Sequence, residues 1–145
     1  MMKSVYISFG LLLALALPTA GAETITLDIN AHSIQAEIAH TPERRSKGLM
    51  QRTNLCPDCG MLFVFNKSHQ HAFWMRDTPL PLSIAFIAAD GTIINIEEMQ
   101  PFSVTFYRAQ SKALFALEMN SNWFTKKNIL PGAFIHGLDQ APPGQ

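Results

Sequence analysis

Two apolar runs joined by a tight-turn dipeptide constrain the fold more than any other part of this sequence. Residues 82–88 and 92–99 are rich in apolar side chains, and Asp90-Gly91 lies between them. Asp-Gly readily supplies the positive φ values of a tight turn. The stretch 82–99 therefore predicts an antiparallel β-hairpin.

A second hairpin is predicted near the start of the chain. Apolar residues alternate with polar ones over 24–29 and again over 34–38, on either side of the turn-prone residues 30–33. Alternation with a period of two is typical of strands that bury one face. The two segments are therefore expected to pair with each other.

A short helix is predicted directly after this hairpin. Thr41 can cap a helix N-terminus, Pro42 suits the first turn, and Gly48 can end the helix about two turns later. Further strands are predicted over 61–65 and 72–75, joined by the polar residues 66–71, and over 113–119 and 133–136. A second short helix is expected through Lys127, capped by Ser121 or Asn122.

Strands dominate this pattern and the connections between them are short. The predicted fold class is therefore α+β, mostly β: a compact, mostly antiparallel sheet or partial barrel with one or two short helices. Residues 23–140 are expected to form a single β-rich domain, and the Pro- and Gly-rich residues 141–145 a disordered tail.

Residues 1–22 have the pattern of a secretory signal peptide. Lys3 precedes an apolar run over 5–17, then Pro18 and the small residues Ala20-Gly21-Ala22, which predict cleavage after Ala22. An uncleaved membrane anchor is the alternative, but a span needs about 20 apolar residues. A location in the periplasm or outside the cell follows, with no stable membrane span after cleavage.

Charge is nearly balanced once this segment is removed. Lys3 is the only charged residue within 1–22, and the whole chain has 11 basic and 11 acidic residues. Such a balance does not indicate the excess of basic residues with which proteins bind nucleic acid.

Several blocks occur in an order that resembles one family of small, often exported bacterial and archaeal proteins, domain of unknown function 192. The blocks cover residues 41–50, 60–65, 73–78, 81–87 and 117–120, followed by Trp123-Phe124. The resemblance implies a compact β-rich domain with no established enzymatic activity. Its shared polar and aromatic positions are Arg45, Arg52, Trp74, Met75, Thr78 and Glu118.

The chain departs from that family pattern at two positions. Ser83 stands where the family usually has an acid, and Asp77 where it has an amide. An acidic role in a shared pocket would then be lost or moved to Asp77. The two cysteines and His69-Gln70-His71 are not part of the family pattern.

Cys56 and Cys59 have the spacing of thioredoxin-like redox sites. Those sites open a helix within a βαβ unit, whereas here a strand-like run follows directly. Two thiols this close in an oxidising compartment favour a structural disulfide. We therefore prefer the disulfide to a catalytic thiol pair.

His69 and His71 would lie on the same side of an extended segment, a spacing compatible with copper or zinc. Two exposed histidines in a polar loop are the preferred interpretation, because two ligands alone do not make a site. No cofactor is therefore predicted. A thiol-disulfide or copper-handling protein that uses both cysteines and both histidines is the alternative function.

The candidate ligand site combines guanidinium groups, an aromatic face, a hydroxyl and carboxylates. Such groups could bind a small polar molecule, for instance a sugar or a carboxylate. Ordinary ion pairs, such as Arg45 with Glu118, are the competing interpretation, and a carboxylate pair for glycoside hydrolysis is a third. No catalytic residue is assigned. The site residues are Arg45, Arg52, Trp74, Asp77, Thr78 and Glu118.

These features lead to an exported, non-enzymatic module. Its expected partner is a small polar ligand or a protein of the cell envelope.

Overall fold

A computed structural model describes residues 21–145. Nearly all of the predicted signal peptide lies outside these residues. Within the described range, no helix combines the length and the apolar character that a membrane crossing demands.

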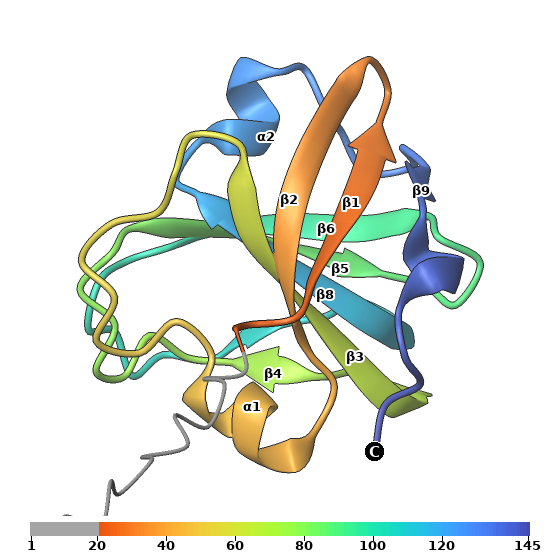
Figure 1. The fold of residues 1–145 in the computed structure, drawn as a ribbon. Coiled ribbons are helices and arrows are strands. Elements are labelled where there is room, and N and C mark those ends of the chain that lie inside the picture. The colour runs from red at the N-terminus through yellow and green to blue at the C-terminus, as the bar shows by residue number, and fades with distance from the viewer. Residues whose placement is uncertain (1–20) are drawn as a thin grey trace, which may run out of the picture.

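The fold is mostly β, as predicted, and is built on a seven-stranded half-barrel sheet (Figure 1). The strand order is β6-β5-β8-β3-β2-β1-β9. The pair β2 and β3 is parallel, whereas the other neighbours are antiparallel. The strands are β1 (Thr24–Ile29), β2 (His32–Ala39), β3 (Cys59–His69), β5 (Leu82–Ile87), β6 (Ile93–Met99), β8 (Ala113–Asn120) and β9 (Ile135–His136).

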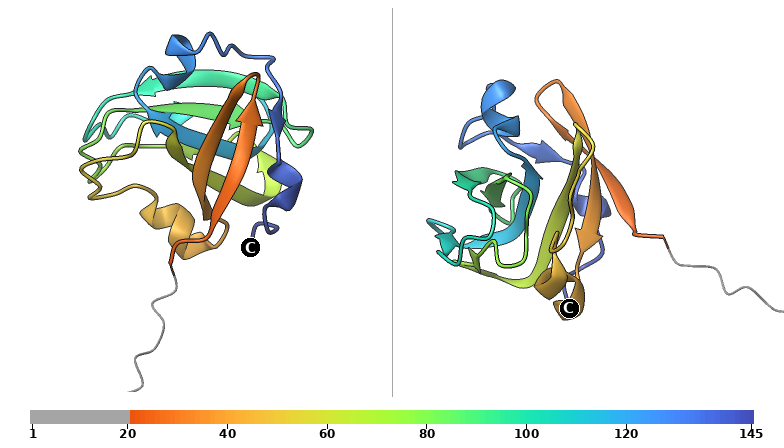
Figure 2. Two further views of the ribbon diagram at one scale, coloured as in Figure 1. Left: turned by 45° about the horizontal axis from the view of Figure 1, so that its top comes forward. Right: turned by 90° about the vertical axis from the view of Figure 1, so that its left-hand side faces the viewer.

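The sheet curls so that its two ends approach each other (Figure 2). β9 pairs with β1, and Phe134, just before β9, forms an isolated bridge with Thr92, just before β6. A separate two-stranded sheet, β4 (Ala72–Phe73) and β7 (Tyr107–Arg108), completes the strands.

Both predicted hairpins are confirmed. β1 pairs with β2 in continuous register, so the apolar residues of both strands share the buried face. β5 pairs with β6, and the turn between them is fixed by Asp90, whose carboxylate accepts a hydrogen bond of 2.9 Å from the Thr92 amide.

The two helices are also confirmed, with one difference in capping. α1 (Pro42–Lys47) begins after Thr41, whose hydroxyl accepts a 3.3 Å hydrogen bond from the Arg44 amide, and ends at Gly48. α2 (Trp123–Lys126) follows Asn122, which has a left-handed φ of 61° and makes no side-chain capping bond. A 3-10 helix, η1 (Leu138–Gln140), lies near the end of the chain.

Two apolar clusters cover the two faces of the sheet. One joins β1 and β2 to α2, and the other packs on the opposite face beneath Leu49, Met75 and Leu80. The central strands β3, β5 and β8 contribute alternate residues to each cluster. Burial on both faces explains why these strands are nearly continuous apolar runs in the sequence.

Some predicted boundaries were wrong. β3 continues through Asn66–His69, which we expected to be a connection, because its main chain pairs again with β8 after a shift in register. The polar side chains there are exposed while the main chain stays in the sheet. The strands expected over 72–75 and 133–136 are shorter, and β7 was not predicted.

Residues 141–145, for which a disordered tail is predicted, lie against the domain in this structure. The Gln145 amide donates a 2.9 Å hydrogen bond to the carbonyl of His40. Gly144 approaches the main chain of Phe65 so closely that a Cβ atom would collide with it. The absence of a side chain at Gly144 is therefore what lets the tail lie against β3.

Candidate functional site

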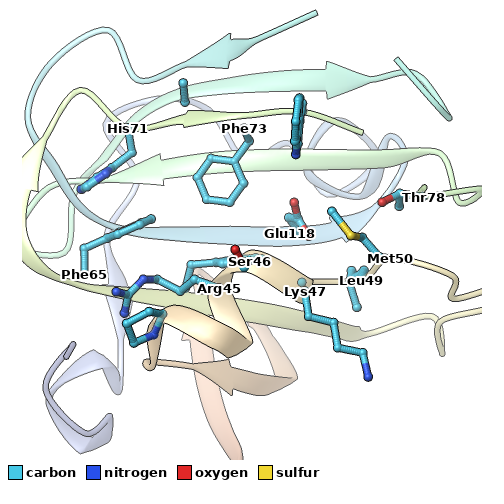
Figure 3. Close-up of a pocket in the computed structure, with 15 residues that line it drawn as sticks. Arg45, Ser46, Lys47, Leu49, Met50, Phe65, His71, Phe73, Thr78 and Glu118 are labelled. Atoms are coloured by element: carbon cyan, nitrogen blue, oxygen red, sulfur yellow. The ribbon is translucent and has the colours of Figure 1, made fainter. Parts of the chain in front are cut away.

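A pocket of about 490 Å³ lies on the face of the sheet that α1 and β4 cover (Figure 3). Residues of α1 and the turn after it form one wall, the apolar residues of β3 and β4 form others, and β8 contributes Glu118. The lining residues are Pro42, Arg45, Ser46, Lys47, Gly48, Leu49, Met50, Phe63, Phe65, His71, Ala72, Phe73, Trp74, Thr78 and Glu118.

Glu118 is the buried carboxyl of this pocket. It lies in the middle of β8, directly opposite Met61 of β3 and Ile84 of β5, and is only 5% exposed. Desolvation raises its pKa from 4.5 to about 8. No donor of residues 21–145 forms a hydrogen bond or an ion pair with its carboxyl group.

Arg45 lines the same pocket, but it is not the partner of Glu118. Its guanidinium donates to three main-chain carbonyls: His40 at 2.6 Å, Val64 at 2.9 Å and Gln145 at 2.6 Å. It also lies over the ring of Phe65, 5.3 Å from the centroid. The ion pair with Glu118 considered from the sequence does not form. Arg45 instead ties α1 to β3 and to the end of the chain.

Trp74 and Thr78 also line the pocket. Trp74 is 39% exposed and stacks on Phe106 at a centroid distance of 5.7 Å. Thr78 is buried, and its hydroxyl donates a 3.1 Å hydrogen bond to the carbonyl of Arg76. The Thr78 oxygen therefore keeps its lone pairs available toward the pocket.

The other two predicted site residues lie outside the pocket. Arg52 pairs with Glu37 of β2 at 2.7 Å. Asp77 is exposed, with a left-handed φ of 55°, and its carboxylate lies 3.8 Å from the guanidinium of Arg76. The pocket thus brings together Arg45, Trp74, Thr78 and Glu118 but not Asp77, so the glycosidase pairing of Asp77 with Glu118 gains no support.

Several pocket residues were not predicted, chiefly the aromatic ones. Phe65 and His71 stack at 3.5 Å, and the Nε2 atom of His71 lies 3.1 Å from the carbonyl oxygen of Lys67. Burial lowers the pKa of His71, which keeps its ring neutral near pH 7. Phe63 and Phe65 share a face with buried Met61, so strand periodicity would have indicated their side of the sheet. Nothing local predicts the position of Phe73.

The sulfur atoms of Cys56 and Cys59 lie at disulfide distance. Cys59 begins β3 rather than a helix, so no helix N-terminus stabilises a thiolate there. The loop is held by Asn120, whose amide donates a 2.9 Å hydrogen bond to the Cys56 carbonyl, and by the Trp123 indole, which donates to Asp58 at 3.0 Å. These hydrogen bonds fix the loop that contains the two cysteines, which is the setting of a structural disulfide.

His69 and His71 lie near each other, with ring centroids 5.7 Å apart. Across residues 21–145, however, no cluster of three or more His, Cys, Asp or Glu side chains could hold a metal ion.

A family model of uncharacterised proteins, DUF192, matches residues 24–137. The chain belongs to the DUF192 family. The match covers every strand of this DUF192 protein and the whole pocket. A comparison with curated proteins gave no match.

Two solved structures share the fold of this DUF192 protein. A candidate transcription regulator from Sinorhizobium meliloti 1021 is 31% identical with a TM-score of 0.77, over 81% of this chain and 95% of that one. A protein of unknown function from Novosphingobium aromaticivorans DSM 12444 is 31% identical with a TM-score of 0.78, over 83% and 89% of the two chains.

Proposed function

We propose that this DUF192 protein is an exported, non-enzymatic module that binds a small polar ligand, or a polar group of an envelope partner, in the pocket at Glu118. The observation that carries the proposal is a buried carboxyl group without a partner that lines an open pocket. Arg45, Trp74 and Thr78 are the other predicted site residues that support it.

An unpartnered buried carboxyl is costly to the folded protein. Removing a polar group from water without a compensating hydrogen bond costs on the order of 1 to 3 kcal/mol in proteins. A ligand that hydrogen bonds with Glu118 would offset this cost. Carboxyl groups in a pocket whose pKa is strongly shifted by burial are also typical of functional sites.

The chemistry of the pocket supports binding more than catalysis. In the described part of the chain, the pocket residues include no nucleophile hydrogen bonded to a base. His71, the one imidazole in the lining, is stacked on Phe65, and its Nε2 lies against the Lys67 carbonyl rather than a nucleophile. A single carboxyl does not provide the acid and base pair that hydrolysis of a glycoside needs.

Export is supported by the signal-like residues 1–22 and by the cysteine pair. Disulfides persist in oxidising compartments and are rare in the cytosol. Cell fractionation of the tagged full-length chain tests export: we expect a shortened product in the periplasm or medium. A full-length product confined to the cytosol would contradict this part of the proposal.

Ligand binding is tested by NMR. The purified protein is titrated with a set of small sugars, alcohols, amines and carboxylates while the Trp74 indole and the Thr78 amide are observed. We expect at least one class to shift both signals in the wild type and to lose affinity in Glu118→Gln. The Glu43→Gln variant makes the same chemical change at an exposed residue of α1 outside the pocket lining, so it is the matched control and should bind like the wild type.

A further inference from the structure

We propose that the ligand group recognised at Glu118 is a protonated primary amine on an apolar body. This inference rests on the proposed function, and it names the chemical class that the pocket takes. It follows from three properties of the pocket: its unpaired carboxyl, its lack of an available cation, and its apolar walls.

The first property is that the polar groups facing the cavity offer acceptors: Thr78 through its hydroxyl oxygen, and Glu118 through its carboxylate once it gives up the proton that it holds near pH 7. Glu118 has no partner, and its carboxyl group is directed into the cavity near Met50 and Phe73 (Figure 3). The Thr78 hydroxyl donates its hydrogen bond to the Arg76 carbonyl, so toward the cavity it offers lone pairs. A ligand with several N–H donors complements both groups, and an ammonium group has three.

The second property is that no cation of the pocket is available to Glu118. The Arg45 guanidinium is bonded to three carbonyls and is directed toward Phe65, away from Glu118. The Lys47 ammonium points away from the cavity (Figure 3). His71 is held neutral by its burial. A cation that stabilises the ionised form of Glu118 must therefore come from the ligand.

Acidic groups on the neighbouring strands do not change this conclusion. The cross-strand row through Glu118 continues from Met61 to Glu37 on β2 and from Ile84 to Glu97 on β6. Glu37 is paired with Arg52, and Glu97 accepts a 3.0 Å hydrogen bond from Asn95. The charged residues around Glu118 on the packed elements are Arg45 and Lys47 of α1, Arg76 and Asp77 before Thr78, His71, Glu37 and Glu97.

The third property is the character of the walls. Leu49, Met50, Phe63, Phe73 and Trp74 present hydrocarbon, thioether and aromatic surfaces. Aromatic faces attract cations, and apolar surfaces bury an alkyl chain. An anionic ligand is disfavoured, because Glu118 is either neutral or negative and never offers it an opposite charge. The carboxylate ligands considered from the sequence are therefore excluded from the proposal.

The test compares three probes of one length: 1-aminohexane, 1-hexanol and hexanoate. Each is titrated into the protein produced from the full chain, with NMR signals of Trp74 and Thr78 and calorimetry as readouts. We expect the amine to bind at least about tenfold more tightly than the alcohol, as expected for a charge-assisted bond. Hexanoate should not bind, Glu118→Gln should remove the preference for the amine, and Glu43→Gln should retain it.

Proton linkage provides a second readout. In the empty pocket the Glu118 carboxyl holds a proton near pH 7, and an arriving ammonium should displace it. Calorimetry in buffers of different ionisation enthalpy should give close to one proton released per amine bound. As pH rises toward about 8, the affinity for the amine should increase roughly tenfold per pH unit, and above about 8 it should level off.

A fourth probe, Nα-acetyl-lysine methylamide, separates two sources of the same group. Binding comparable to that of 1-aminohexane indicates a lysine side chain of a partner protein, whereas binding of the free amine alone indicates a small molecule. Either outcome supports the inference.

Equal binding of alcohol and amine, with no proton release, would overturn the amine inference and leave the proposed pocket function standing. If neither these probes nor the sugars, alcohols, amines and carboxylates of the NMR test described above shift the signals of Trp74 and Thr78, the proposed function fails as well.

Discussion

Replacing Glu118 by glutamine should make the protein more stable at neutral pH, and by a calculable amount. The substitution keeps the shape of the side chain but removes the ionisable group. In the unfolded chain the carboxyl titrates near 4.5, whereas in the folded protein burial raises its pKa to about 8. Between these values the folded state holds a proton that the unfolded state has lost.

The sign of the effect follows from this difference. Stability falls as pH rises wherever the folded state binds more protons than the unfolded state. Each pKa unit corresponds to about 1.4 kcal/mol. The wild type should therefore lose on the order of 3 kcal/mol between pH 5 and pH 7 relative to Glu118→Gln, and slightly more by pH 8. The contribution of Glu118 is fully lost above about pH 8.

Urea unfolding at pH 5, 6, 7 and 8, followed by tryptophan fluorescence, measures this difference. The comparison with Glu118→Gln cancels the opposing effect of His71, whose lowered pKa reduces stability as pH falls. The difference between wild type and variant should be smallest at pH 5 and widen as pH rises. Parallel pH profiles for the two proteins would refute the assignment of a buried carboxyl without a partner.

Three further predictions follow from individual contacts. Gly60→Ala should destabilise the protein by about 1 to 3 kcal/mol in urea unfolding, because the added Cβ would lie 2.5 Å from the carbonyl oxygen of Glu118. An unchanged stability would mean that β3 and β8 separate freely. Arg45→Lys should lower the free energy of unfolding by about 1 to 3 kcal/mol and speed hydrogen exchange at the Gln145 amide, since one ammonium cannot reach three carbonyls. Slow exchange in the variant would argue that Arg45 does not hold the end of the chain. The double variant Cys56→Ser/Cys59→Ser should lose about 2 kcal/mol yet retain amine binding. Alkylation read by mass should find both thiols blocked in the wild type; free thiols, or metal retained after dialysis, would favour the thiol or copper function.

Local signals in the sequence were enough to predict the hairpins and α1. The β5–β6 hairpin follows from Asp90-Gly91, and α1 follows from Thr41, Pro42 and Gly48, because each of these signals lies within the element that it shapes. The parallel pairing of β2 with β3 has no such signal. It depends on how the whole chain closes on itself.

The same distinction separates the pocket residues. Glu118 is an acid within the apolar run 113–119, and that pattern alone marks it as unusual for a buried strand. The role of Arg45 depends on Gln145, 100 residues away in the chain. Asp77 and Thr78 are neighbours in sequence, yet a left-handed turn at Asp77 leaves one exposed and the other buried. Contacts and turns of this kind cannot be predicted from composition or spacing.

A carboxyl-carbon NMR titration of Glu118, with and without 1-aminohexane, tests the central claim most directly. In the free protein we predict a midpoint near pH 8, and a lower midpoint when the amine is bound. A midpoint near the ordinary glutamate value in the free protein, unchanged by the amine, would contradict both the unpaired carboxyl and the ligand that it is proposed to bind.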